Sequence, residues 1–203
     1  MTTLVPTIYA RSFPRTAAWL RELILVIAGV LLLAGLAQVE IVLPFTPVPI
    51  TGQTFGVLLI GAAYGSKRGA ATMIAYIAAG ALGLPFFSGG GSGMRILTGA
   101  TAGYLAGFVV AARVIGLLSE RGLERSVRTS LIPFIAGTLI IYVFGVAWLS
   151  VIVGGFGKAL TLGVLPFLVG DGFKLVAASL ALPAAWSLVA PQAAHTTAHG
   201  YKI

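Results

Sequence analysis

Long apolar runs separated by short polar breaks dominate the chain. Six such runs lie at about residues 20–39, 53–64, 69–84, 98–118, 131–153 and 162–190. A helix needs about 20 apolar residues to cross the hydrocarbon core of a bilayer. The runs at 53–64 and 69–84 are shorter, so we expect these helices to tilt or to be partly covered by neighbours. The pattern predicts an all-α integral membrane protein with six transmembrane helices.

Composition supports this fold class and excludes others. Of the 203 residues, 58% are hydrophobic and 9% are charged, and the mean hydropathy is +1.02. Soluble proteins carry charge on about a quarter of their residues, and disordered chains lack such apolar content. We predict one domain in the cell membrane over residues 1–203, surrounded by lipid. It comprises a cytoplasmic N-terminal segment at 1–19, a six-helix core at 20–190 and a cytoplasmic tail at 191–203.

The basic residues predict an orientation. Cytoplasmic loops of membrane proteins are enriched in Lys and Arg. With both termini in the cytoplasm, only Arg95 and Lys158 lie at the outer side, and loop one (residues 41–52) and loop three (residues 85–97) are external. A nucleic-acid-binding protein would gather its basic residues on a soluble face, so we expect no nucleic-acid partner. Ten basic residues then lie at the cytoplasmic side: Arg11, Arg15, Arg21, Lys67, Arg68, Arg113, Arg121, Arg125, Arg128 and Lys202.

Several common chemistries are missing from the sequence. The chain has no Cys, which excludes thiolate metal sites and cysteine nucleophiles. It has no G-x-x-x-x-G-K-[ST] loop, so it does not bind ATP through that motif. His195 and His199 lie in the polar tail, without the glutamate of the H-E-x-x-H zinc motif between them. We therefore expect neither a metal nor a cofactor.

Asp171 and Lys174 are the most informative polar residues, because they interrupt the last apolar run. A charge at the centre of a membrane helix costs about 2.5–3.5 kcal/mol on insertion scales. A spacing of three places both side chains on one helix face, where they can pair. One interpretation is a structural ion pair. The other, which intramembrane charges favour, is a polar substrate or ion site that accepts N–H groups at Asp171 and donates to oxygen at Lys174.

Other candidate ligand contacts lie in or beside the predicted external loops. Arg95 in loop three has the planar fork that binds a carboxylate with two hydrogen bonds, although it is equally consistent with a surface arginine at the membrane interface. Tyr76 and Tyr104 offer hydroxyl groups and flat faces, or serve ordinary packing. Thr51, Gln53 and Thr54 follow the prolines of loop one and offer hydrogen bonds, and helix capping is the alternative for Thr51.

Small residues recur every fourth position in two of the runs. In lipid, such ridges let helix backbones approach closely. Packing inside the domain is the simpler interpretation, and a docking surface for another membrane subunit is the alternative. The ridges are Ala71, Ala75, Ala79 and Gly83 in the third run, and Gly99, Gly103, Gly107 and Ala111 in the fourth.

One long segment resembles a known family. Residues 38–55, QVEIVLPFTPVPITGQTF, are similar to the signature of the BioY family, the biotin-binding S components of energy-coupling-factor (ECF) transporters. The likeness continues in GLPFFSGG at 83–90, GYLAGF at 103–108 and GDGFK at 170–174, and it covers about residues 20–190.

The resemblance implies an S-component fold of six helices that captures biotin from outside. Asp171 and Lys174 would contact the ligand, and loops one and three would form the lid. The implied partners are an ECF transmembrane coupling protein and cytoplasmic ATPase subunits, which would drive delivery inward. The substrate-binding residues that we predict are Asp171, Lys174, Arg95, Tyr76, Thr51, Gln53, Gly90 and Tyr104.

Two alternatives stay open at this stage. The first is a self-sufficient carrier of biotin or another small solute, working as a homo-oligomer and using protonation of Asp171. The second is an intramembrane enzyme with Asp171 and Lys174 as acid and base. An enzyme would lose turnover but keep binding when Lys174 is changed, whereas a binding subunit would lose affinity. We expect a transporter subunit and no enzymatic activity.

Overall fold

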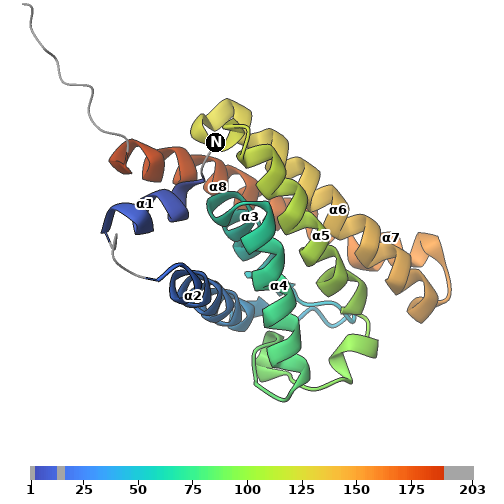
Figure 1. The fold of residues 1–203 in the computed structure, drawn as a ribbon. Coiled ribbons are helices and arrows are strands. Elements are labelled where there is room, and N and C mark those ends of the chain that lie inside the picture. The colour runs from blue at the N-terminus through green and yellow to red at the C-terminus, as the bar shows by residue number, and fades with distance from the viewer. Residues whose placement is uncertain (1–2, 13–16, 190–203) are drawn as a thin grey trace, which may run out of the picture.

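The computed structural model describes residues 3–12 and 17–189, and within them the chain is almost entirely helical (Figure 1). Two two-residue strands, β1 (Glu40–Ile41) and β2 (Ile50–Thr51), pair antiparallel at the base of loop one. Three 3-10 turns lie in loops, η1 (Ser88–Gly90), η2 (Ile96–Thr98) and η3 (Leu123–Arg125). The α-helices are α1 (Leu4–Ser12), α2 (Ala18–Gln38), α3 (Gln53–Tyr64), α4 (Ser66–Ala81), α5 (Ala102–Ser119), α6 (Val127–Val153), α7 (Phe156–Gly163) and α8 (Leu168–Val189).

The last apolar run does not form the single helix that we predicted over 162–190. α7 ends at Gly163 and α8 begins at Leu168. Pro166 contributes to this break, because the residue before a proline is disfavoured in helical conformation. A Cβ atom at Gly163 would lie 2.2 Å from the Tyr104 hydroxyl, so the end of α7 fits closely against α5. α1, in the N-terminal segment, was also not predicted, and the C-terminal tail with His195 and His199 lies outside the described residues.

The all-α class is confirmed, and the number of spans is only partly established. Among the described residues, α2, α5, α6 and α8 are long and apolar enough to cross a membrane. α3 has 12 residues and α4 has 16, which correspond to about 18 and about 24 Å of helix. Both are shorter than the roughly 30 Å hydrocarbon core. The six-span topology therefore stays a prediction.

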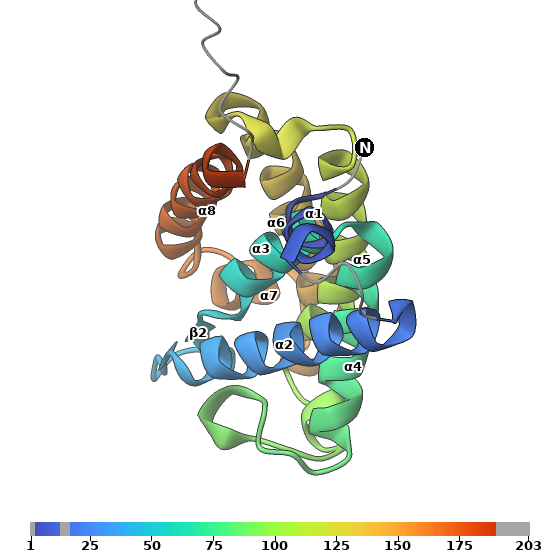
Figure 2. The ribbon, with the colours of Figure 1, turned by 60° about the vertical axis from the view of Figure 1, so that its left-hand side comes forward.

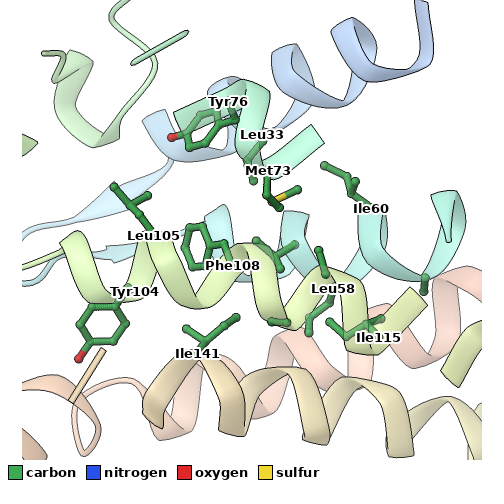
Figure 3. Packing of buried hydrophobic residues seen from close by; sticks show 14 of the residues in the cluster. Leu33, Leu58, Ile60, Met73, Tyr76, Tyr104, Leu105, Phe108, Ile115 and Ile141 are labelled. Atoms are coloured by element: carbon green, nitrogen blue, oxygen red, sulfur yellow. The ribbon is translucent and has the colours of Figure 1, made fainter. Parts of the chain in front are cut away.

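The glycine ridge of the fourth run packs inside the protein. A Cβ atom at Gly103 would lie 2.4 Å from the Phe144 carbonyl oxygen, and one at Gly107 would lie 3.1 Å from the Ile141 Cα atom. These glycines let α5 and α6 run closely side by side (Figure 1). Figure 3 shows the apolar core between α5, α6, α3 and α4, to which Leu105 and Phe108 contribute.

Polar contacts gather at two opposite ends of the bundle. At one end, Glu120 after α5 accepts hydrogen bonds from the backbone N–H and the hydroxyl of Ser66, at 2.7 and 2.8 Å. Arg68 of α4 pairs there with Glu22 near the start of α2, which lies across the other helices (Figure 2). Loops one and three meet at the other end of α2. There, Gln38 donates to the Phe87 carbonyl and accepts the Gly90 N–H.

Candidate binding site

A cavity of about 310 Å³ lies where α3, α5, α6 and α8 meet loops one and three. This volume is at the lower end of the roughly 300–1,000 Å³ of small-molecule sites. Apolar side chains form much of its wall, with Val48 from loop one, Phe87 from loop three and Phe167 from the α7–α8 connection. Six of the eight predicted site residues line it: Thr51, Gln53, Arg95, Tyr104, Asp171 and Lys174.

Asp171 and Lys174 form the ion pair that their spacing predicts. The Lys174 Nζ atom lies 2.8 Å from Asp171 Oδ1, and their side chains are 17% and 7% exposed, respectively. Lys174 also donates to the Thr54 hydroxyl at 2.7 Å, and that hydroxyl lies 3.3 Å from Asp171 Oδ1. α3 and α8 are therefore joined by a compact polar cluster inside the cavity.

Tyr142 of α6 completes this cluster and was not among the predicted site residues. Its hydroxyl donates a 2.5 Å hydrogen bond to Asp171 Oδ2, and the residue lines the cavity. No sequence pattern distinguishes Tyr142 from other aromatic residues in an apolar helix. Its partner lies 29 positions further along the chain, so only the folded structure identifies the contact.

The hydrogen bonds within the cluster leave some donor and acceptor positions of Lys174 and Asp171 unused. A lysine ammonium has three donors, and Lys174 uses two of them. A carboxylate has about four acceptor positions, of which Asp171 uses two at Oδ1 and one at Oδ2. One donor and one acceptor therefore remain beside each other. This combination matches a ligand group that carries a carbonyl oxygen next to an N–H group.

Arg95 lies apart from this cluster and is exposed at the cavity wall. Among the described residues, no carboxylate oxygen lies within 4 Å of its guanidinium, whereas Lys174 is paired with Asp171. The cavity lining therefore carries an uncompensated positive charge at Arg95, which favours an anionic group on the ligand.

Tyr76 and Gly90 do not belong to the cavity lining among the described residues. Tyr76 is fully buried, accepts a hydrogen bond from Gln53 and donates to the Phe86 carbonyl, both at 2.8 Å. The Gly90 N–H is bound to Gln38 at 3.0 Å. Both residues fix loop three, whose Phe87 side chain forms part of the cavity wall. Gly90 has φ +68°, a backbone conformation that suits glycine.

Two hydrogen bonds hold the end of α7 against loop one and α5. The Thr46 hydroxyl of loop one donates to the Leu162 carbonyl at 2.7 Å. The Tyr104 hydroxyl of α5 donates to the Gly163 carbonyl at 2.8 Å. The last carbonyls of a helix have no partner within the helix, so these side chains satisfy them. The Thr51 hydroxyl accepts the Gln53 N–H at 3.2 Å, but Gly52 is the N-cap of α3 and makes no side-chain cap, so this contact is a local turn and not the helix cap that was the alternative interpretation.

Comparison with known proteins agrees with this arrangement. The profile of the BioY family matches residues 8–191. The chain belongs to the BioY family. It is 39% identical over 170 residues to a biotin transporter BioY of Rhizobium etli, covering 79% of this chain and 90% of that protein. A biotin transporter BioY of Thermotoga maritima is 39% identical over 156 residues, covering 77% of this chain and 91% of that protein.

A solved structure shares the fold of this BioY family member. It is the crystal structure of the S component for biotin from an ECF-type ABC transporter. The TM-score is 0.75 at 24% identity, and the match covers 83% of this chain and 92% of the solved chain. The S-component fold predicted from the resemblance is therefore confirmed. Four helices of the described residues are long and apolar enough to cross a membrane, and this BioY family member is a multi-pass protein of the cell membrane.

Proposed function

We propose that this chain is the substrate-binding membrane subunit of a biotin uptake system. Its relatives in the BioY family are named biotin transporters. The observation that carries the proposal is the buried pair of Asp171 and Lys174 in a small-molecule cavity, with one donor and one acceptor unused. The ureido ring of biotin offers N–H donors beside a carbonyl acceptor, which suits this capacity.

The charges of the cavity favour one orientation of the ligand. Lys174 is already neutralised by Asp171, whereas Arg95 has no carboxylate near it among the described residues. We therefore assign the ureido ring to the Asp171 cluster and the carboxylate of biotin to Arg95. Thr51, Gln53 and Tyr104 complete the contact set. Tyr76 and Gly90 belong to the site through loop three, which they fix in place.

We also propose the topology that the sequence predicts. Residues 1–203 would form one membrane domain with six spans and both termini in the cytoplasm, with the segment at 1–19 and the tail at 191–203 on that side. The separation of Lys67 and Arg68 from loops one and three, at opposite ends of the bundle, supports this orientation. The cavity loops would then face outward.

Delivery of biotin inward is assigned to an ATP-driven partner. The chain has no Walker-type loop of its own, and its structural neighbour is the S component of an ECF-type ABC transporter. We propose an ECF coupling protein and cytoplasmic ATPase subunits as partners. A self-sufficient homo-oligomeric carrier is the alternative to this module. Catalysis by Asp171 and Lys174 is set aside, because the named relatives are transporters.

Equilibrium binding of labelled biotin to the purified full-length protein in detergent tests the proposal. We expect saturable binding of about one biotin per chain, with no binding of an unrelated vitamin under the same conditions. Absence of binding to folded, monodisperse protein would overturn the biotin assignment and leave the fold intact. Uptake into proteoliposomes, with and without a reconstituted ATPase module, then distinguishes the dependent subunit from the self-sufficient carrier.

A further inference from the structure

We infer that Tyr142 is a positioning residue of the binding site, because its hydroxyl fixes the Asp171 carboxylate so that Oδ2 can accept an N–H group of the ligand. The inference rests on the proposed function, since it assigns a role within the same cavity. It concerns a residue that the sequence pattern did not single out and that lies on a different helix from the Asp171 and Lys174 pair.

The contacts of the two carboxylate oxygens are unequal. Oδ1 of Asp171 is held by Lys174 at 2.8 Å and by Thr54 at 3.3 Å. Among the described residues, only Tyr142 binds Oδ2, at 2.5 Å. Without the Tyr142 hydroxyl, the carboxylate is held at one oxygen and its plane can rotate. The direction of the free acceptor position on Oδ2 therefore depends on Tyr142.

A second tyrosine in the same cavity provides the contrast. Tyr104 and Tyr142 both line it, but the Tyr104 hydroxyl is bound to the Gly163 carbonyl at 2.8 Å. Tyr104 therefore holds the end of α7, and Tyr142 holds the ligand-binding carboxylate. A hydrogen bond to a charged group is roughly twice as strong as one between neutral groups. Loss of the Tyr142 hydroxyl is therefore expected to weaken ligand binding more than loss of a wall contact.

A double-mutant cycle tests this coupling. Labelled-biotin affinity is measured for the full-length parent, Tyr142→Phe, Asp171→Asn and the double variant. We expect Tyr142→Phe alone to weaken binding about tenfold to a hundredfold. In the Asp171→Asn background the same change should cost at most about threefold. The matched control is Tyr64→Phe, which removes a hydroxyl at the end of α3 that does not line this cavity and should leave affinity unchanged.

The outcomes separate the two proposals. If the parent does not bind biotin, the proposed function fails before Tyr142 is tested. If the parent binds and Tyr142→Phe binds equally well, or if the two changes are additive, the role of Tyr142 is overturned. A large loss that disappears in the Asp171→Asn background supports it, because a residue that only shapes the wall would cost the same in both backgrounds.

A spectroscopic measurement covers the case in which Tyr142→Phe does not fold. Tyr142 is replaced at this single position by 3-fluorotyrosine, which keeps the hydroxyl, and its fluorine resonance is recorded with and without Asp171→Asn. We expect the resonance to move when Asp171 is changed and again when biotin saturates the site. A resonance that does not respond to Asp171→Asn would overturn the proposed contact, whatever biotin does.

Discussion

The ion pair between Asp171 and Lys174 differs from the ion pair between Glu22 and Arg68 in its surroundings. The first lies in the cavity of about 310 Å³ with largely apolar walls. The second lies at the opposite end, beside a cavity of about 250 Å³ that is lined by Glu22, Tyr64, Ser66, Lys67, Arg68 and Glu120. The first cavity is lined by apolar residues as well as polar ones, which is typical of small-molecule sites. Every residue that lines the second cavity is charged or carries a hydroxyl group.

The two regions also differ in how they use their hydrogen-bonding groups. The Nε and Nη2 groups of Arg68 both donate hydrogen bonds to the Glu22 carboxylate, and these bonds connect α4 to α2. Glu120 binds the first residue of α4, so the α5–α6 loop is fastened to the α3–α4 turn. In the Asp171 cluster, by contrast, the open donor and acceptor positions lie beside each other in a cavity that also has apolar walls. The comparison supports our proposal that the first region binds the ligand, and it indicates that the second region stabilises the fold.

The largest expected effect comes from the ligand-binding cluster. Asp171→Asn and Lys174→Ala should each weaken biotin binding by more than about 1–3 kcal/mol, because a polar partner is left unsatisfied. The double variant Asp171→Leu/Lys174→Met should abolish binding while the thermal midpoint without ligand stays the same or rises. Apolar residues often replace a buried ion pair without loss of stability. Biotin titration and thermal unfolding in detergent measure both quantities.

The opposite result for these variants would contradict the distinction between a ligand-binding pair and a structural pair. If the double variant loses stability and the two single variants bind biotin as the parent does, the pair has a structural role and the site lies elsewhere. Glu22→Gln is the matched control, because it changes a carboxylate of the other ion pair and should leave biotin affinity unchanged.

A smaller effect is expected at the fold-stabilising end. Glu120→Ala removes the side chain that binds the N–H and the hydroxyl of Ser66 at the start of α4. Loss of a comparable helix cap costs about 0.5–2 kcal/mol. We expect a lower thermal midpoint with biotin affinity unchanged, and Glu120→Gln, which keeps an acceptor oxygen, should lose less. A drop in biotin affinity without a drop in stability would show that the two regions are not separable.

The sequence predicted the parts of the molecule that leave a local signal. The run at 53–64 coincides with α3, and the runs for α2 and α6 agree within a few residues, because a helix in lipid must stay apolar along its length. Asp171 and Lys174 stood out because charges are rare in such a run. The predicted run 162–190 began too early, although Gly163 and Pro166 are local signals of a helix break, because the residues between α7 and α8 are otherwise as apolar as the helices.

Contacts between residues far apart in the chain could not be predicted from the sequence. The bond from Tyr142 to Asp171 and the bond from Thr46 to the Leu162 carbonyl join positions 29 and 116 residues apart. Tyr76 was predicted as a ligand contact, and the structure shows its hydroxyl bound to Gln53 and to the Phe86 carbonyl. A tyrosine in an apolar helix looks the same in sequence whether it faces a cavity or a loop, so only tertiary packing decides between these roles.

The smallest expected effect concerns Glu124 in η3, a buried carboxyl at the fold-stabilising end. Its side chain is fully buried, the Arg125 Nε atom lies 4.0 Å from Oε1, and among the described residues neither oxygen has a partner at ordinary hydrogen-bonding distance. Burial raises the pKa of Glu124 above its ordinary value of 4.5, and its own backbone N–H, the charge of Arg125 and the indole of Trp186 offset this only in part. A carboxyl with a raised folded-state pKa contributes its full stability below pH 4.5 and loses it as the pH rises through the folded-state pKa.

Glu124→Gln removes this titration and keeps the shape of the side chain. We expect the variant and the parent to unfold at the same temperature at about pH 4, and the variant to gain a few degrees over the parent toward about pH 8. Thermal unfolding in detergent across this range measures the difference, and biotin affinity should not change. A parent that is more stable than Glu124→Gln at high pH would mean that the ionised carboxylate is well paired, as it is in the Glu22 and Arg68 pair. Glu124 would then be a paired acid that helps to hold η3 in place.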